Sequence, residues 1–234
     1  MECASSCSRV SATETIYDLA SLTKVIGTTT AVMILFDEGR IQLDAPVVTY
    51  LPEFTGGYKD SVTVRQLLEH RSGLPADRDL WRIAHSPAEA RQVVLEAPLE
   101  CKPGQCYIYS DLGAITLGMM VERVTGQGLD VFLHERVFAP LGMVNTFFKP
   151  ADSVKSRVAP TEVPPPRGSP AQGASHDEDA YPRGRAPGRA GLLTPAPTPP
   201  SLPRAEPPVV SRARTFGISP RDIPAECPVR CRRP

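Results

Sequence analysis

The sequence has no net charge and no long apolar run, and these two absences exclude several classes of protein. Its 26 lysines and arginines balance 26 aspartates and glutamates, so no strongly charged partner such as nucleic acid is indicated. No run of 18 apolar residues is present, which argues against a membrane-spanning helix, and residues 1–10 lack a signal-peptide core. As written, the sequence predicts a soluble chain, cytoplasmic by default, and periplasmic or secreted if the true N-terminus is missing.

Histidines at zinc-site spacing are also lacking beside the six cysteines, which fall into three close pairs. The pairs are Cys3 and Cys7, Cys101 and Cys106, and Cys227 and Cys231. Without histidine partners these pairs do not indicate zinc, and no metal or cofactor is expected. Cys101 and Cys106 flank a turn, where they either form a bridge in an oxidising compartment or remain free thiols.

Aromatic residues are scarce in the last third of the chain. Residues 151–234 contain 18 of the 26 prolines, a net charge of +5, and only Tyr181 and Phe216 as aromatics, whereas residues 1–150 carry a net charge of −5. A segment with so little apolar mass does not offset the entropy lost on ordering. The sequence therefore predicts a helix-rich folded domain over 1–150 and a largely disordered Pro/Arg-rich tail over 151–234. The tail arginines lack interleaved aromatics, which argues against nucleic-acid binding.

The candidate chemistry starts at Ser21, three residues before Lys24. Residues 24–38 are apolar on most of a helical circumference, with Gly39 placed as a stop, and predict a buried helix. Because residues i and i+3 share a helix face, the Ser21 hydroxyl and the Lys24 amine are predicted to meet. A desolvated lysine has a lowered pKa and can take a proton from a serine nucleophile. The alternative is a capped helix start with Lys24 extending into solvent.

The second constellation is Tyr109-Ser110-Asp111, ahead of an apolar run over 112–124. A lysine ammonium beside Tyr109 would lower the pKa of its phenol and allow it to transfer protons; the alternative is an ordinary buried tyrosine. Asp111 is expected to accept hydrogen bonds from lysine or substrate, or to cap the following helix, or both. His70 precedes a Ser-Gly-Leu-Pro turn, where backbone bonding is favoured over a catalytic role.

Local signals predict further elements. Two capping boxes begin helices at Thr63 and Ser86, the second with a proline at its first helical position. Helices are also expected over 112–124 and 129–138, with an extended approach over 15–20 and a short strand over 143–148.

The first 150 residues resemble the serine β-lactamase and penicillin-binding-protein superfamily, nearest to its class C-like β-lactamase-related hydrolases. The resemblance rests on ordered blocks that follow one another in family order. These are Ile16–Lys24, Asp37–Val47, Tyr50–Phe54, Val62–Pro75, Tyr109–Asp111 and Leu141–Met143. Short fragments at 176–181 and 189–192 also resemble family segments, between runs of Pro, Arg and Ala.

The resemblance implies an α/β (α+β) fold of the β-lactamase/transpeptidase type, here mainly its helical part with an incomplete antiparallel sheet. It implies Ser21 as the acylated nucleophile, Lys24 as base or relay, and Tyr109 as the second acid/base residue. Asp111 stands where many members have Asn, and the Ser21 N–H would supply half of an oxyanion hole. The chain reads as truncated at both ends, with no counterpart of the family's late Lys-Thr-Gly-like strand, and a shifted reading frame is one hypothesis for the tail.

Two readings of function follow. The first is a serine hydrolase that forms an acyl-serine on a small-molecule or peptide-like ester, amide or β-lactam, impaired if sheet strands are missing. The second is a catalytically inactive homologue that acts as a binding or interaction module. The sequence indicates neither the substrate nor the oligomeric state.

Overall fold

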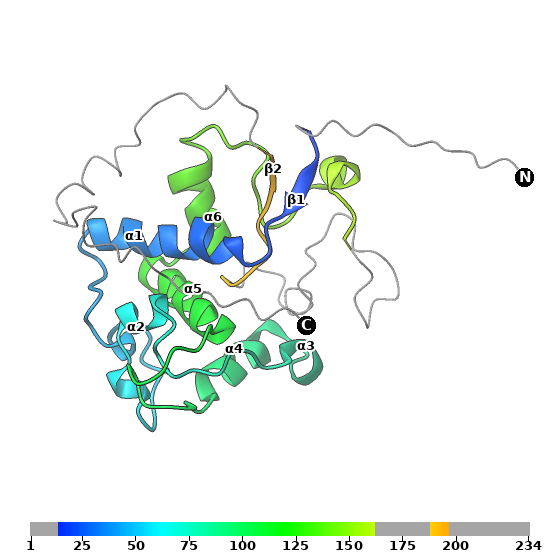
Figure 1. Ribbon diagram of the computed structural model, residues 1–234. Coiled ribbons are helices and arrows are strands. Elements are labelled where there is room, and N and C mark those ends of the chain that lie inside the picture. The colour runs from blue at the N-terminus through cyan, green and yellow to red at the C-terminus, as the bar shows by residue number, and fades with distance from the viewer. Residues whose placement is uncertain (1–13, 162–187, 197–234) are drawn as a thin grey trace, which may run out of the picture. The chain divides into compact units, whose positions relative to one another are not determined.

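The computed structural model describes residues 14–161 and 188–196, which belong to one compact unit that ends at Ala196 (Figure 1). Two short strands and several helices make up the regular structure of these residues. They are β1 (Ile16–Asp18), α1 (Thr30–Asp37), α2 (Val64–Leu68), α3 (Leu80–Ile83), α4 (Pro87–Glu96), α5 (Asp111–Thr125), α6 (Leu129–Leu133) and β2 (Leu193–Pro195). None of the helices in these ranges is long and apolar enough to cross a membrane.

Helix α5 is the centre of the described structure. The Ser110 hydroxyl caps its start by accepting from the Gly113 N–H, and Gly126 ends it in the left-handed region with φ 73°. The helix is buried over Leu112–Val121 and packs against α1, α2, α4 and α6. Figure 1 shows α2, α3 and α4 on one side of α5, with α6 and the two strands on the other. Residues at the start of α5 therefore lie between the two parts.

The predicted helix over 24–38 is present but is less uniform and less buried than its composition indicated. It begins as a π-helical segment, Lys24–Thr29, continues as α1, and is followed by Gly39 with φ 70°. Val25 is 62% exposed and Met33 is 50% exposed, so one face of the helix is open to solvent among the described residues. The predicted burial holds for most of the segment between Lys24 and Leu35, and fails on the face that carries Val25 and Met33.

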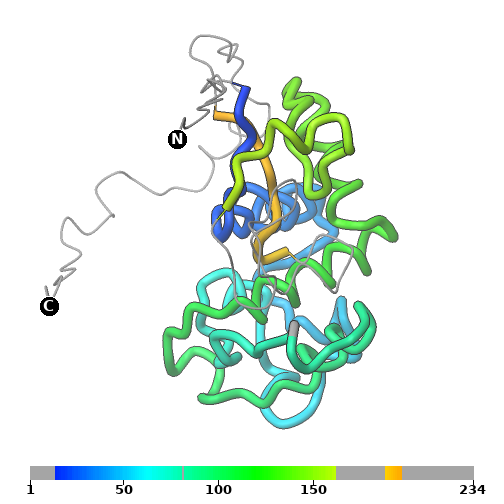
Figure 2. The backbone as a smooth tube through the Cα atoms, turned by 90° about the vertical axis from the view of Figure 1, so that its right-hand side faces the viewer, coloured from blue at the N-terminus to red at the C-terminus, as the bar shows by residue number. Residues whose placement is uncertain are grey.

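The sheet joins the two ends of the described chain. Strands β1 and β2 pair antiparallel, with Tyr17 opposite Thr194, and lie side by side in both ribbon and tube views (Figure 2). Leu193 also bridges to Phe147, and together with Ile16 and Val158 it forms a small second core. The strand predicted over 143–148 is reduced to that single bridge, because turns occupy 139–142 and 144–145.

The compact unit extends beyond the predicted boundary at residue 150. Val158 and Leu193 are each buried against Ile16, and the Ala159 N–H donates to the Ile16 carbonyl. Long-range pairing with β1 thus keeps residues 151–161 and 188–196 in the fold despite their poor local signals. The remainder of the predicted disordered tail, 162–187 and 197–234, lies outside the described residues.

Helix starts agree with the local signals more closely. Thr63 and Gln66 form both bonds of a capping box at α2. At α4 Ser86 accepts from the Glu89 N–H behind a proline at the first turn, but the Glu89 carboxylate returns to the His85 N–H instead of the cap residue. Cys101 and Cys106 form a disulfide across the turn that precedes Tyr107–Tyr109.

Candidate active site

Ser21 and Lys24 lie at the start of the first helical segment and contact each other. The Lys24 Nζ donates to Ser21 Oγ at 2.8 Å. Lys24 is only 6% exposed, whereas Ser21 is exposed in the turn before the π-helical segment. The amine is therefore held away from bulk water while the hydroxyl remains reachable from solvent, an arrangement that suits a serine nucleophile.

The backbone before Ser21 is strained. Ala20 has φ 45°, in the left-handed region that residues with a Cβ seldom adopt. The Asp18 carboxylate accepts the Ala20 N–H at 2.8 Å, and the Leu19 N–H donates to the Leu192 carbonyl at 2.9 Å. These bonds hold the residues that lead into Ser21.

Asp111 forms an ion pair with Lys24. Its Oδ1 lies 2.7 Å from Lys24 Nζ, and its own side chain is 24% exposed. The expectation that Asp111 caps α5 was wrong: the cap is Ser110, whose hydroxyl reaches the Gly113 N–H, while Asp111 is the first helical residue. Because the cap is supplied by its neighbour, the Asp111 carboxylate is available to the Lys24 ammonium.

Tyr109 joins this group through its ring. The centroid of the ring lies 4.9 Å from Lys24 Nζ, within the range of a cation–π contact. The side chain is 47% exposed, which does not fit the alternative of an ordinary buried tyrosine. Ser21, Lys24, Tyr109 and Asp111 are thus gathered at one place by the starts of two helices.

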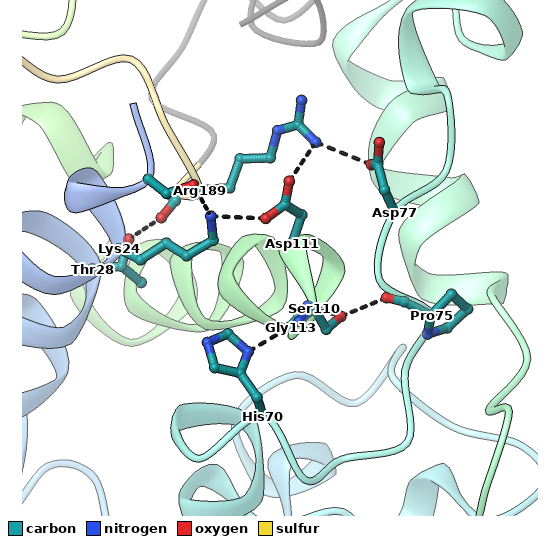
Figure 3. Close-up of polar contacts among 11 residues, drawn as sticks. Lys24, Thr28, His70, Pro75, Asp77, Ser110, Asp111, Gly113 and Arg189 are labelled. Atoms are coloured by element: carbon teal, nitrogen blue, oxygen red, sulfur yellow. Dashed lines mark hydrogen bonds and ion pairs between the residues drawn. The ribbon is translucent and has the colours of Figure 1, made fainter. Parts of the chain in front are cut away.

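His70 contacts the ring of Tyr109. Its ring lies 4.6 Å from the Tyr109 ring, and its Nδ1 accepts the Ser110 N–H at 3.1 Å, the backbone role favoured by the sequence (Figure 3). Burial, followed by the nearby positive charge of Lys24, lowers the pKa of His70 against an opposing effect of Asp111. A neutral imidazole is also what the accepted hydrogen bond requires, because a protonated ring has no free acceptor.

Arg189 is a residue of the site that sequence reasoning missed. Its Nη1 lies 3.0 Å from Asp111 Oδ2 and 3.0 Å from Asp77 Oδ1, so it bridges the two carboxylates (Figure 3). It comes from the short segment before β2, between stretches rich in proline and arginine. The signal available was the fragment Arg189-Ala190-Gly191-Leu192, a small-residue turn that leads into apolar residues.

Comparison with known proteins identifies the family of the chain. The family model for Beta-lactamase matches residues 7–198, so the chain belongs to the β-lactamase family. A curated relative in Escherichia coli K12, named putative D-alanyl-D-alanine carboxypeptidase, is 34% identical over 209 residues, covering 78% of this chain and 48% of the relative. The chain therefore spans about half the length of the curated relatives it matches.

Solved structures show the same fold. A class C β-lactamase superposes with a TM-score of 0.65 at 20% identity, covering 80% of this chain and 49% of the other. A β-lactamase/D-alanine carboxypeptidase from Yersinia pestis superposes with a TM-score of 0.62 at 22% identity, covering 78% and 51%. The architecture is accordingly that of the β-lactamase/transpeptidase fold, mostly helical in the described residues, with a small antiparallel sheet.

Proposed function

We propose that the protein is a serine acyl hydrolase in which Ser21 is acylated by an ester, amide or β-lactam. The observation that carries this proposal is the 2.8 Å contact between Lys24 Nζ and Ser21 Oγ, made by a lysine that is buried and paired with Asp111. Membership of the β-lactamase family supports it. A lysine that served only the fold would not need to meet an exposed serine.

The proposed reaction has two halves. Ser21 Oγ bonds to the acyl carbon while its proton passes to Lys24, or through Lys24 to Tyr109. The bond to the leaving group then breaks, and the leaving group takes a proton from the same relay. A water molecule subsequently attacks the acyl carbon, the Ser21–acyl bond breaks, and Ser21 regains a proton. The Ser21 N–H contributes half of an oxyanion hole in this scheme.

The resting contacts bear on the first proton transfer. Lys24 donates to Ser21 Oγ and lies against the Asp111 carboxylate. An ammonium has no lone pair, so Lys24 must lose a proton before it can accept one from Ser21. Tyr109, whose ring lies against the ammonium, is the proposed second group of the relay, and Asp111 the group that holds Lys24 in place.

The substrate class follows from the relatives. The E. coli relative carries the name D-alanyl-D-alanine carboxypeptidase, so a peptide-like acyl substrate heads the series to test, ahead of small esters and β-lactams. The proposed steps require water and the side chains of the chain itself, with no cofactor.

The test compares the wild-type protein with Ser21→Ala. Both are incubated with a fluorescent fluorophosphonate and with a fluorescent penicillin, and labelling is followed on a denaturing gel beside a circular-dichroism spectrum. Labelling of the wild type and its loss in Ser21→Ala is the expected result, because both probes form a covalent bond to the nucleophile. A D-alanyl-D-alanine peptide, a chromogenic ester and a chromogenic cephalosporin then distinguish the substrate classes.

A folded wild-type protein that takes neither label would contradict the proposal. That outcome would favour the other reading of the sequence, a catalytically inactive homologue that acts as a binding module. Equal labelling of Ser21→Ala would show that another residue reacts, and would equally remove Ser21 from the proposed role.

A further inference from the structure

Lys24 and Arg189 share one carboxylate. We propose that Arg189 is a positioning residue for the acyl transfer: its fixed positive charge behind Asp111 limits how strongly Asp111 holds Lys24 as an ammonium. This inference rests on the proposed function, because it concerns the readiness of Lys24 to accept the Ser21 proton.

The geometry places the two cations on opposite oxygens of Asp111. Lys24 Nζ lies 2.7 Å from Oδ1, and Arg189 Nη1 lies 3.0 Å from Oδ2. Figure 3 shows Lys24 approaching Asp111 from the first helix and Arg189 approaching it from the segment before β2. The Arg189 side chain is only 8% exposed, so its charge is poorly screened by solvent. A guanidinium does not lose its proton in a protein, so this charge is constant over the working pH range.

The backbone on either side of Arg189 is anchored to the helix that carries Lys24. The Thr28 hydroxyl donates to the Gly188 carbonyl, and the Leu192 N–H donates to Thr23 Oγ1 at 3.1 Å. Gly188 has φ 82°, and a Cβ there would lie 2.8 Å from the Ala114 carbonyl oxygen, so the chain passes too close to α5 for a larger residue. Arg189 is therefore held at a fixed distance from Lys24 by neighbours of Lys24 itself.

Asp77 partly offsets the positive charge of Arg189. Its Oδ1 lies 3.0 Å from Arg189 Nη1, and its side chain is 48% exposed. The chain of contacts thus alternates in charge from Lys24 through Asp111 and Arg189 to Asp77. Within residues 14–161 and 188–196, the other groups that face Lys24 are Ser21 Oγ and the Tyr109 ring, and His70 contacts that ring.

The signs of the expected effects follow from Coulomb's law. Removing the positive charge of Arg189 leaves Lys24 as the partner of Asp111 in this pair of contacts, so the Asp111 carboxylate attracts the ammonium more strongly. The pH at which Ser21 becomes reactive is therefore expected to rise. Removing the negative charge of Asp77 leaves Arg189 less compensated and lowers that pH. Opposite shifts from two residues that touch each other are not expected from a general loss of structure.

The experiment measures the rate of fluorophosphonate labelling of Ser21 between pH 6 and pH 10 in the full chain. For Arg189→Gln the half-maximal pH of labelling is expected to rise by about one unit, because Arg189 is separated from Lys24 by Asp111 alone. For Asp77→Asn the half-maximal pH is expected to fall by about a few tenths of a unit, because Asp77 is one contact more distant from Lys24. Arg189→Lys keeps the charge but not the planar fork, so its half-maximal pH should lie between those of wild type and Arg189→Gln.

Arg91→Gln is the matched control. Arg91 pairs with Glu122 at 2.6 Å, an arginine–carboxylate contact at the far end of α5. Its profile should coincide with that of wild type. Thermal unfolding of each variant accompanies the labelling, and Asp77→Asn and Arg189→Lys carry the test if Arg189→Gln does not fold.

Coincident profiles for wild type, Asp77→Asn and Arg189→Lys would overturn the inference while leaving Ser21 labelling, and so the proposed function, intact. Equal shifts in Arg91→Gln and Arg189→Gln would also overturn it, because the effect would then be general. Absence of Ser21-dependent labelling in the folded wild type would instead remove the proposed function, and this inference with it.

Discussion

Two buried lysines in this fold, Lys24 and Lys59, are equally inaccessible and have different partners. Each is 6% exposed, and each places its ammonium over an aromatic ring, Tyr109 at 4.9 Å or Phe54 at 5.7 Å. Lys59 donates to the Leu95 carbonyl in the last turn of α4, where a cation satisfies a helix end. Lys24 instead meets a hydroxyl and a carboxylate.

The comparison shows that burial of a lysine does not identify a reactive site. The pKa of Lys59 is lowered by burial, against smaller opposing effects of Glu96 and Asp60, yet its hydrogen bond goes to a helix end. What distinguishes Lys24 is the kind of group it contacts. Three predictions test this distinction, from the largest expected effect to the smallest.

The largest effect is expected from replacing each lysine by glutamine. Lys24→Gln should lower the rate of Ser21 labelling by about 10³-fold, because the relay loses its proton acceptor. Lys59→Gln should leave that rate within about twofold but lower the free energy of unfolding by about 1–2 kcal/mol, since the Leu95 carbonyl loses a charged donor. Labelling rates and urea unfolding curves measure both. Similar losses of Ser21 labelling in the two variants would mean that Lys24 has no special role in the reactivity of Ser21.

The second effect concerns Asp111, the carboxylate that Lys24 contacts and Lys59 does not. Asp111→Asn removes the counter-charge of the ammonium, so the half-maximal pH of Ser21 labelling should fall by about one to two units. The plateau rate should fall by less than about tenfold, because an amide oxygen still accepts from Lys24. Asp44→Asn is the control, since Asp44 pairs with Arg65 on the surface. An unchanged profile in Asp111→Asn would separate Asp111 from the function of Lys24.

The smallest effect is on stability at alkaline pH. Because the pKa of Lys59 is lowered in the fold, the unfolded chain keeps the Lys59 proton to higher pH than the folded chain does. Stability therefore rises as pH increases from the folded pKa toward about 10.5, the unfolded value. The difference in free energy of unfolding between wild type and Lys59→Gln should grow over that alkaline range. A difference that stays constant or shrinks with pH would contradict the burial of a charged Lys59.

Sequence reasoning was most reliable where a feature is local. The helix-start signal at Thr63 and the approach of Lys24 to Ser21 depend on residues three apart, and their geometry is fixed by the helix itself. The cap of α5 was misplaced by one residue because Ser110 and Asp111 are both good caps, and only the distant Lys24 decides between them. The Tyr109 ring was placed beside Lys24 through the family pattern, which no local spacing supplies.

Arg189 marks the limit of that reasoning. Its position depends on contacts to Asp77 and Asp111, more than seventy residues away in the chain, and on a glycine that fits only against α5. The one local signal was the family-like fragment 189–192, and it identifies neither carboxylate partner of Arg189. The described part of the chain shows that the decisive neighbours of a site residue are set by packing.

The left-handed backbone of Ala20 links the stability of the fold to the orientation of the Ser21 side chain. A non-glycine residue in that conformation costs on the order of 1 kcal/mol, which the rest of the fold must absorb. Glycine would adopt the same backbone conformation without that penalty, but its greater backbone freedom would allow Ser21 several orientations. Alanine at this position therefore lowers the stability of the fold slightly, and it restricts the Ser21 hydroxyl to an orientation that meets Lys24 before substrate binds.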